Sequence, residues 1–478
     1  MSATKAHNQR GLVLLSLRLP GCKIIHSPRQ ISDCIAPAEL APLSAEHNKN
    51  PKRVLMTDQK LETVAGNGLI NRRHLLGLGL TGMGTALANS ALAADAGLSL
   101  EIPGWSRQPG PGASGYGRRS SYTEHMQRAA GNPNPLYPGG GASRSPLHQL
   151  QGTITPNSLH FERHHAGVPN IDPSLHKLVI HGLVRQPLVF DYEDLLKYPM
   201  VSKIYFLECS GNSGSLFGAN AANGSAQSLH GLVSCAEWTG IPLSVLLDEA
   251  GVEPNAQWIN AVGADAASMG RSIPLNRALD DVLLALYQNG EPVRPEQGYP
   301  MRLLVPGCEG NVSVKWLTQI KLSEAPGQFR DETSKYTDTR LDRSSLQFTL
   351  PMDTKSVITS PSGQMALNRQ GLYQVTGIAW SGRGSIRRVE VSADGGRSWA
   401  DAMIDSHQSE KALTRFRIPW QWSGGDAVLQ SRATDSLGNM QPTRASLLAE
   451  RGNISTYHFH GIQSWAVNTA GEVSNVYA

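Results

Sequence analysis

The amino-acid sequence predicts an α+β protein, with a mixed α/β domain over residues 151–348 and a small β-sandwich over residues 349–478. The chain has 478 residues, which is too long for one ordinary core. Short β-rich runs alternate with helical patterns in the first range, whereas polar and apolar residues alternate in the second. The 48 glycines and 29 prolines supply the turns that such short elements need.

Residues 1–93 are predicted to be a leader. The pair Arg72-Arg73 precedes a stretch of Gly, Ala and Leu that ends in Ala91-Leu92-Ala93, which is the arrangement of a twin-arginine signal peptide. This signal implies export of an already folded protein to the periplasm. Its glycines keep the stretch too polar for a membrane span, so we expect none in the mature chain rather than a retained anchor. The start is either Met1 or Met56, and the second choice makes residues 1–55 an upstream extension.

Cleavage after Ala93 would remove Cys22 and Cys34 and leave Cys209, Cys235 and Cys308. An exported chain cannot pair an odd number of cysteines with one another. The sequence leaves open whether Cys235 and Cys308 are bridged or simply buried. We expect Cys209 to be free.

Residues 94–150 are predicted to be an irregular segment that wraps the outside of a domain, because Pro and Gly cluster there. Farther along, Leu178–Leu183 is typical of a strand and Asp191–Leu196 of a capped helical turn. Two longer helices are expected, over residues 240–251 and 273–290, since each begins near a proline and ends at a glycine.

The range after residue 350 has the pattern of a sandwich. Leu372–Ile378 and Val389–Ser392 alternate between polar and apolar residues, and Asp394-Gly395-Gly396 is typical of a hairpin turn. We expect most of this domain to support or dimerise the first one.

Cys209 directly follows the apolar run Ile204–Leu207, which predicts a buried strand. The small residues after it leave room around the sulfur. A thiolate is both a nucleophile and a ligand for soft metals, so Cys209 is a candidate for either role, or else a packed core residue.

Polar segments recur near the ends of the other expected strands, where sheets of this kind place ligands. They are Phe161–His165, Cys209 with Asn212, Asp265, Tyr299–Arg302 and Ser313–Trp316. Together they gather cationic and hydrogen-bonding groups around one thiol. That inventory suits an anionic cofactor that bears a phosphate and a soft metal.

These motifs, in this order, resemble those of the sulfite oxidase family of molybdenum-cofactor enzymes over roughly residues 155–470. The resemblance implies a molybdopterin domain followed by an immunoglobulin-like dimerisation domain, with Cys209 as the molybdenum ligand. The residues that it places at the pterin are Phe161, Arg163, His165, Asp265, Gln297, Arg302, Ser313 and Lys315. It places Tyr336 in the active site, and Arg383 is expected as a cation that reaches the substrate pocket from the second domain.

The sequence departs from the family's animal members at two points. Asn212 is followed by Ser213 and Gly214 instead of paired arginines, and Gln297 replaces a histidine that binds the pterin. The first change is expected to widen or neutralise the pocket. No Cys-x-x-Cys-His haem motif or cytochrome b-like domain is present, so electrons must pass to a separate protein. These traits are most similar to the family's sulfane dehydrogenase branch, which implies a c-type cytochrome partner.

Several residues have a plainer interpretation. In the plainer interpretation, Asp265 only caps a loop and Tyr336 only packs against its neighbours. Lys315 is expected to contribute its backbone rather than its ammonium group. His164 is expected to be a bystander. His458 and His460 are expected to be structural, because no further metal ligands stand at fixed spacing from them.

The resemblance implies a periplasmic enzyme that oxidises protein-bound sulfane sulfur or sulfite, as a homodimer or as a heterotetramer with its cytochrome. The alternatives are a molybdenum-dependent sulfoxide reductase, a metal-free hydrolase with Cys209 as nucleophile and His165 as base, and a secreted binding module. A net charge of +4 with 17 % charged residues gives no support for nucleic-acid binding.

Overall fold

The computed structural model describes residues 63–70, 102–132, 135–136, 138–405 and 409–478. The predicted twin-arginine pair, its cleavage site, Cys22 and Cys34 lie outside the described residues. No helix in the described ranges is long and apolar enough to cross a membrane.

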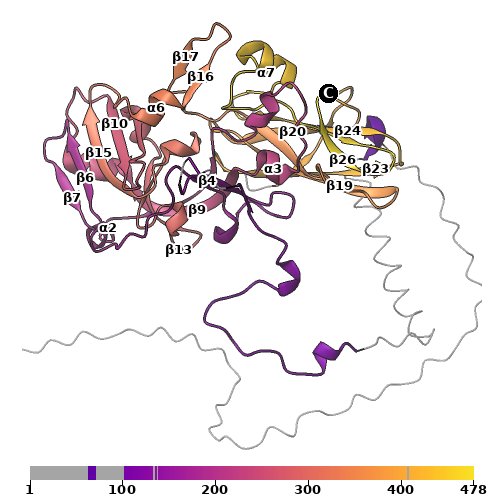
Figure 1. Ribbon diagram of the computed structural model, residues 1–478, viewed down its shortest axis with the longest axis horizontal. Helices are drawn as coiled ribbons and strands as arrows, with labels where there is room; N and C mark the ends of the chain where they lie inside the picture. Colours follow the sequence, from indigo (N-terminus) through magenta and orange to yellow (C-terminus); the bar gives the residue numbers. More distant parts are fainter. Residues whose placement is uncertain (1–62, 71–101, 133–134, 137, 406–408) are drawn as a thin grey trace, which may run out of the picture. The chain divides into compact units, whose positions relative to one another are not determined.

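Two five-stranded sheets form the framework of the α/β domain (Figure 1). The first has the order β11-β10-β15-β6-β7 (Gly270–Pro274, Trp258–Gly263, Leu317–Ser323, Leu178–Gly182, Leu188–Phe190). In it β15 and β6 are parallel, and the other neighbours are antiparallel. The second is antiparallel, with the order β13-β12-β9-β8 and β14 beside β12 (Glu291–Pro292, Leu283–Gln288, Val233–Pro242, Val201–Glu208, Arg302–Leu304).

One apolar core joins the two sheets and includes Ile180, Ile241, Ile320 and Leu284. The predicted helix around residue 245 is present as α4 (Leu243–Ala250) and contributes its buried leucines to this core. It ends at Gly251, whose φ of 69° is a left-handed conformation that glycine adopts readily.

The prediction of a helix over residues 273–290 is wrong. Only α5 (Leu275–Ala278) is helical there, and Leu283–Gln288 is the central strand β12. The side chains of this strand are buried on both faces, because Leu284 and Leu286 pack in one apolar core and Leu283 and Ala285 pack in another. A strand covered on both faces has a continuous apolar run, which cannot be told from a buried helix by its periodicity.

Shorter elements complete the domain. They are the sheets β3-β4-β5 (Ala129–Ala130, Gly141–Arg144, Glu162–His164) and β16-β17 (Thr337–Thr339, Ser345–Gln347) and the helices α2 (Tyr192–Leu195), α3 (Ala226–His230) and α6 (Arg330–Ser334). The 3-10 turns are η2 (Gly104–Ser106), η3 (Ser121–Thr123), η4 (Asn157–Leu159), η5 (Gly214–Phe217), η6 (Pro295–Gln297) and η7 (Gly310–Val312). The capped turn predicted at Asp191 is α2, in which Asp191 and Asp194 form a capping box.

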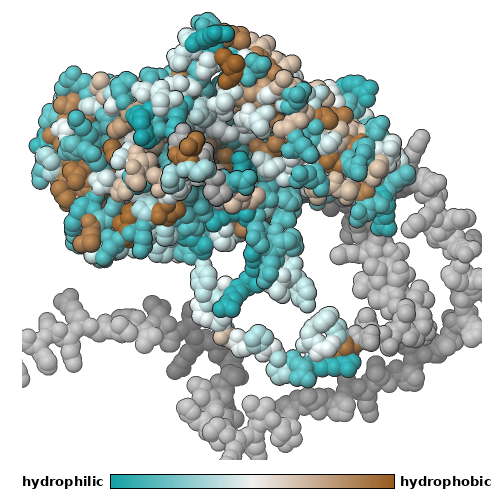
Figure 2. Space-filling model, viewed as in Figure 1, coloured by the Kyte–Doolittle hydropathy of each residue, from teal (hydrophilic) through white to brown (hydrophobic). Residues whose placement is uncertain are grey.

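Residues 102–122 of the segment predicted to be irregular do lack regular strands and α-helices, and all of them are exposed. Its trace in Figure 1 corresponds to mostly hydrophilic surface in Figure 2. Its last part differs from the prediction, because β4 pairs with β5 inside the domain. The proposed boundary at residue 150 therefore separates two strands of one sheet.

The second domain is a β-sandwich, as predicted. One sheet has the order β1-β2-β23-β19-β18 with β22 beside β23 (Thr63–Ala65, Leu69–Ile70, Thr414–Trp422, Gly371–Trp380, Lys355–Ser360, Met403–Ile404). The other has the order β21-β20-β24-β25-β26 (Ala400–Asp401, Ile386–Ser392, Ala427–Asp435, Ser464–Val467, Val473–Val476), and α7 (Arg444–Arg451) follows β24 in the chain. The core shared by the two sheets includes the buried aromatic residues Phe416, Trp420, Phe459 and Trp465.

Part of the predicted leader lies against this sandwich. Strands β1 and β2, joined by the turn η1 (Gly66–Gly68), pair with each other, and Leu69 of β2 pairs with Trp420 of β23. Cleavage after Ala93 stays a prediction, because the structure does not describe that site.

A buried carboxylate joins the two domains. Glu208, at the end of β8, accepts hydrogen bonds from Lys355 Nζ of β18 at 2.9 Å, Trp380 Nε1 of β19 at 2.6 Å and Asn212 Nδ2 at 2.9 Å. Glu208 is fully buried and Lys355 almost so. Their desolvation is offset by this complete set of partners.

We expect Glu208→Gln to lower the free energy of unfolding by about 3–5 kcal/mol, because it leaves the Lys355 ammonium group buried without a countercharge. Urea denaturation followed by tryptophan fluorescence measures the change. Asp194→Asn is the matched control, since it breaks the exposed ion pair of Asp194 with Lys197 and should cost about 0.5 kcal/mol or less. Equal effects of the two substitutions would contradict this account of the junction.

Candidate cofactor-binding and active site

A pocket lies where the polar segments meet. Ten of the predicted site residues line it: Phe161, Arg163, His165, Cys209, Asp265, Gln297, Arg302, Ser313, Lys315 and Tyr336. The sheets bring them together because Cys209 follows β8, Asp265 lies just beyond β10, Arg302 begins β14, and Ser313 and Lys315 precede β15. Arg163 lies in the middle of β5.

Cys209 is a free thiol at the pocket wall, and Cys235 and Cys308 are also free and buried. Its backbone N–H donates to Leu232 O at 3.0 Å, and its carbonyl accepts from Asn212 N at 2.8 Å, which closes the loop after β8. Burial raises the pKa of the Cys209 thiol, and the nearby charge of Arg163 opposes this. Such a thiol is a weak nucleophile unless a cation stabilises its anion.

Arg302 is the most deeply buried cation of the pocket. Its guanidinium donates to Ser313 O at 3.1 Å and to both the backbone and side-chain oxygens of Gln297 at 3.2 Å. It forms no ion pair in the described part of the chain, and burial lowers its pKa to about 9. Gln297 in turn donates to Phe161 O at 2.8 Å, so its side chain is held where it orients Arg302.

Lys315 directs its ammonium group into the interior. Nζ lies 2.8 Å from His164 Nδ1 and donates to Arg163 O at 3.2 Å and Glu296 O at 3.1 Å. Burial, and next the charge of Arg302, hold the pKa of Lys315 well below its usual value. The side chain therefore has a defined position, in addition to the backbone role expected from the sequence.

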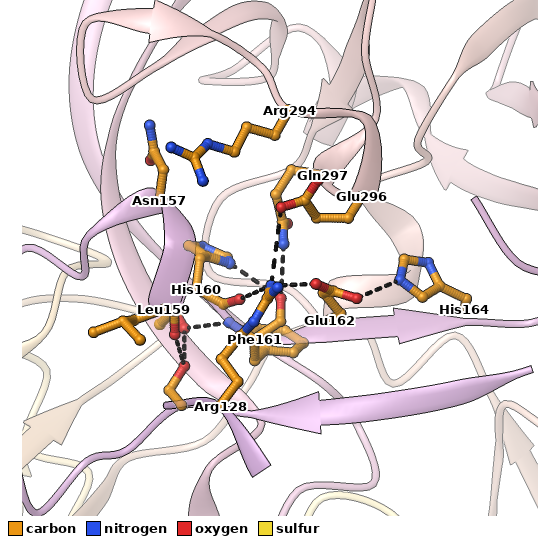
Figure 3. A network of polar contacts seen from close by, with 12 residues as sticks. Arg128, Asn157, Leu159, His160, Phe161, Glu162, His164, Arg294, Glu296 and Gln297 are labelled. Atoms are coloured by element: carbon orange, nitrogen blue, oxygen red, sulfur yellow. Dashed lines mark hydrogen bonds and ion pairs between the residues drawn. The ribbon is translucent and has the colours of Figure 1, made fainter. Parts of the chain in front are cut away.

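His164 is a connecting residue rather than a bystander. Its Nε2 lies 3.0 Å from Glu162 Oε2, and Glu162 pairs with Arg128 (Figure 3). Because His164 Nδ1 also contacts Lys315 Nζ, a polar chain runs from Arg128 to Lys315. Arg128 also donates to His160 O at 3.0 Å. This chain fixes β5 and with it the backbone that carries Arg163.

His165 and Tyr336 form a pair at the pocket. His165 Nε2 lies 2.7 Å from Tyr336 Oη. Burial and then the charge of Arg163 lower the pKa of His165 to about 4, and burial raises that of Tyr336, so both are neutral near pH 7. The Arg271 guanidinium lies 4.9 Å from the centre of the Tyr336 ring and binds Glu309 at 2.8 Å and Glu332 at 3.2 Å. Tyr336 is thus oriented from two sides and is more than a packing residue.

Asp265 caps its loop and also lines the pocket. Its Oδ1 accepts from Met269 N at 3.0 Å and its carbonyl accepts from Ser268 N at 2.8 Å, so it caps its loop. It is also the one carboxylate among the described residues that line the pocket.

The expectation that Arg383 reaches the pocket is wrong. Its guanidinium lies 3.6 Å from the Asp353 carboxylate, and the side chain is half exposed and does not line the pocket. Asp353 attracts it to the surface of the domain junction. The second domain instead approaches through Tyr457, whose ring centre lies 5.7 Å from that of Tyr336.

The loop after Cys209 also differs from the expectation of a wider pocket. Ser213 Oγ lies 2.8 Å from Lys355 Nζ and 2.7 Å from His230 Nδ1, so position 213 faces the domain junction. A Cβ at Gly214 would lie 2.5 Å from Thr456 O. The second domain therefore fills the space beside Gly214.

Sequence reasoning missed several residues. Met269 and Asn311 line the pocket, while Arg271 and Tyr457 act through their contacts with Tyr336. Asn311 adjoins a predicted motif and was within reach of a motif-based search. Arg271 and Tyr457 had no local signal, because only the fold brings them to the site. His458 and His460 lie 3.5 Å from Glu309 and 3.6 Å from Asp353, respectively.

The lining residues fit an anionic cofactor. Arg163, Arg302 and Lys315 face a pocket that has Asp265 as its one carboxylate among the described residues. Asn311 Oδ1 is buried there without a hydrogen-bond partner. Buried cations without countercharges are costly, so this arrangement matches a phosphate-bearing group at the cations and a soft metal at Cys209.

Family models match the two domains separately. Residues 165–329 match the oxidoreductase molybdopterin binding domain, and residues 347–464 match the Mo-co oxidoreductase dimerisation domain. The chain is 32 % identical to chicken (Gallus gallus) sulfite oxidase over 330 residues, which cover 63 % of this chain and 71 % of that protein. The chain belongs to the sulfite oxidase family of molybdenum-cofactor oxidoreductases.

Other relatives share part of their length with the chain. Mitochondrial sulfite oxidase of Mus musculus is 32 % identical over 64 % of this chain and 60 % of its own length. A nitrate reductase of Ulva prolifera is 33 % identical over 52 % of this chain and 32 % of its own length. The sulfane dehydrogenase SoxCD of Paracoccus pantotrophus superposes with a TM-score of 0.77 and 43 % identity, over 79 % of this chain and 98 % of the solved one.

We expect Arg302→Met to lower pterin content more strongly than it lowers the stability of the cofactor-free chain. The substitution removes a buried cation that has no carboxylate partner among the described residues, and this gain offsets part of the loss of its hydrogen bonds to Ser313 and Gln297. Pterin fluorescence after acid extraction and the melting temperature of the cofactor-free protein measure the two effects. Arg294→Met is the control, because Arg294 pairs with Glu291 at 2.7 Å outside the pocket. An equal loss of pterin in both variants would contradict this role for Arg302.

Proposed function

We propose that this chain is the molybdenum subunit of a periplasmic dehydrogenase that oxidises sulfane sulfur bound to a carrier protein and passes the electrons to a c-type cytochrome. The observation that carries the proposal is the free thiol of Cys209 in a pocket lined by Arg163, Arg302 and Lys315. The solved sulfane dehydrogenase SoxCD, 43 % identical over 98 % of its chain, supports this substrate class. The dimerisation-domain match supports a homodimer, or a heterotetramer with the cytochrome.

In this proposal the residues that line the pocket have separate roles in binding the cofactor and the substrate. The molybdenum cofactor, when bound, supplies a two-electron acceptor and the oxygen chemistry at sulfur. Cys209 holds the metal, and Arg302, Lys315 and Asp265 hold the pterin and its phosphate. Arg163 attracts an anionic sulfur group, and Tyr336, neutral and oriented by His165, offers it a hydrogen bond.

The metal-free hydrolase is disfavoured by the same geometry. His165 Nε2 is occupied by Tyr336, and its pKa of about 4 makes it a poor base near pH 7. The buried Cys209 thiol has a raised pKa, the opposite of an activated nucleophile.

Oxidation of free sulfite is a second candidate, favoured by the identity of 32 % with the mouse and chicken sulfite oxidases. Export through the twin-arginine route is supported by the Arg72-Arg73 pair and the Ala91-Leu92-Ala93 motif.

We expect Cys209→Ser to reduce turnover about 100-fold or more, because a hydroxyl is a poorer ligand than a thiolate for a soft metal. Pterin content should fall much less, since Arg302 and Lys315 are unchanged. Elemental analysis for molybdenum and ultraviolet-visible spectra with and without reductant measure metal retention. Cys235→Ser, which alters a buried thiol outside the pocket, should keep molybdenum and activity. Wild-type turnover in Cys209→Ser would reject the proposal.

Steady-state reduction of a c-type cytochrome distinguishes carrier-bound sulfane sulfur from free sulfite as the substrate. We expect faster reduction with a carrier protein that bears a persulfide than with free sulfite at equal sulfur concentration. Carrier protein without the sulfane sulfur is the control. Rapid turnover of sulfite and none of the carrier would assign the chain to sulfite oxidation instead.

A further inference from the structure

A short hairpin from the predicted leader packs on the sandwich. It comprises residues Thr63–Ile70, named here the docking segment, and lies beside β23 and β24 in Figure 1. An isolated two-stranded hairpin is at best marginally stable in water. The segment therefore owes its order to contacts with the sandwich.

Asn67 makes most of the polar contacts. Its side-chain amide donates to Ala393 O at 2.8 Å and Asp426 O at 3.3 Å, and its carbonyl accepts from Trp420 Nε1 at 2.8 Å. Asn67 has a φ of 60°, a left-handed conformation that asparagine tolerates in tight turns. Gly66 N donates to Ser398 Oγ at 2.7 Å. The turn of the hairpin is thus bound by several loops of the sandwich.

The second strand of the segment supplies apolar contact. Leu69 and Ile70 are 0 % and 1 % exposed. Leu69 belongs to the same core cluster as Phe416 and Trp420 of the sandwich. Burial of Leu69 in this core contributes to binding.

The two glycines permit the close approach. A Cβ at Gly68 would lie 2.1 Å from Gln421 O, and a Cβ at Gly66 would lie 2.2 Å from Asp394 Oδ2. Gly68 also has a φ of 93°, which disfavours other residues. The sequence Gly66-Asn67-Gly68 is therefore shaped for this surface.

The receiving surface exists only in the folded sandwich. Asp394 accepts from Ser398 Oγ at 2.6 Å and Ser398 N at 3.0 Å, which orients the hydroxyl that Gly66 binds. The Trp420 donor lies on β23 and the Asp426 acceptor in the loop between β23 and β24. Segments that are far apart in the sequence must meet to form this site.

We propose that the sandwich carries a binding site for the chain's own docking segment, which tethers Arg72-Arg73, two residues beyond Ile70, to the folded domain of the precursor. The proposal extends the proposed export. Binding of the docking segment does not depend on the export route. The consequence that we draw from it, an export signal coupled to folding of the sandwich, does depend on that route. The peptide class that the site accepts is a short hairpin with a Gly-Asn-Gly turn and two apolar residues after it.

Hydrogen-deuterium exchange of the full-length precursor tests the binding. We expect the amides of residues 66–70 to exchange at least about 100-fold more slowly than in an unstructured peptide. Gly68→Ala should abolish this protection while β19 and β24 stay protected. Val64→Ala is the matched control, because Val64 is 42 % exposed and should keep the protection. Asn67→Ala is a second variant, which removes the amide contacts and also disfavours the left-handed conformation of the turn.

The outcomes separate docking from export. Unprotected amides in the wild-type precursor, or protection that survives both Gly68→Ala and Asn67→Ala, would overturn the docking site. The fraction of protein recovered from the periplasm, measured with Arg72→Lys/Arg73→Lys, tests export on its own. Cytoplasmic retention of the wild type with a protected segment would reject export and leave the docking site standing.

Discussion

The bonds of the buried Glu208 carboxylate determine how the rest of the site is arranged. Glu208 ends β8 and is bound by Lys355 and Trp380 of the sandwich, and the next residue is Cys209. Asn212 donates to Glu208 at 2.9 Å and accepts from Leu232 N at 3.1 Å, so the cysteine loop is closed against the same carboxylate. A buried charge tolerates little displacement of its partners. The position of the thiol therefore depends on both domains, and the sandwich is part of the site as well as a candidate dimerisation module.

The charges of the pocket are arranged for binding at the expense of stability. Arg302 is bound by carbonyl and amide oxygens and lies over the Trp238 ring, and Lys315 is bound by carbonyls and a histidine and lies over the Trp316 ring. Burial lowers the pKa of both cations, and no carboxylate pairs with either among the described residues. In the domain junction burial also lowers the pKa of Lys355, but its carboxylate partner Glu208 opposes this. The structure balances charge where it needs rigidity and leaves positive charge uncompensated where an anionic cofactor fits.

Much of the architecture could be predicted from local patterns. Some elements depend only on residues that are near each other in the sequence. They are the strand before Cys209, the capped turn at Asp191 and the hairpin turn at Asp394. The failures depend on tertiary contacts. Leu283–Gln288 is a strand because three other strands pair with it, and Arg383 turns away because the fold offers it Asp353. Arg271 and Tyr457 could not have been found, since nothing near them in the sequence indicates that Tyr336 lies beside them.

The approach of Tyr457 changes where substrate selectivity can reside. Ser213 is bound to Lys355 and His230, and Gly214 lies against the Thr456 backbone. A larger side chain at Gly214 would require the second domain to move, because a Cβ there already overlaps Thr456 O. The small residues after the cysteine loop therefore do not leave an enlarged cavity behind. Selectivity must come from residues that do reach the cofactor pocket or its edge, namely Arg163, Tyr336 and the neighbouring Tyr457.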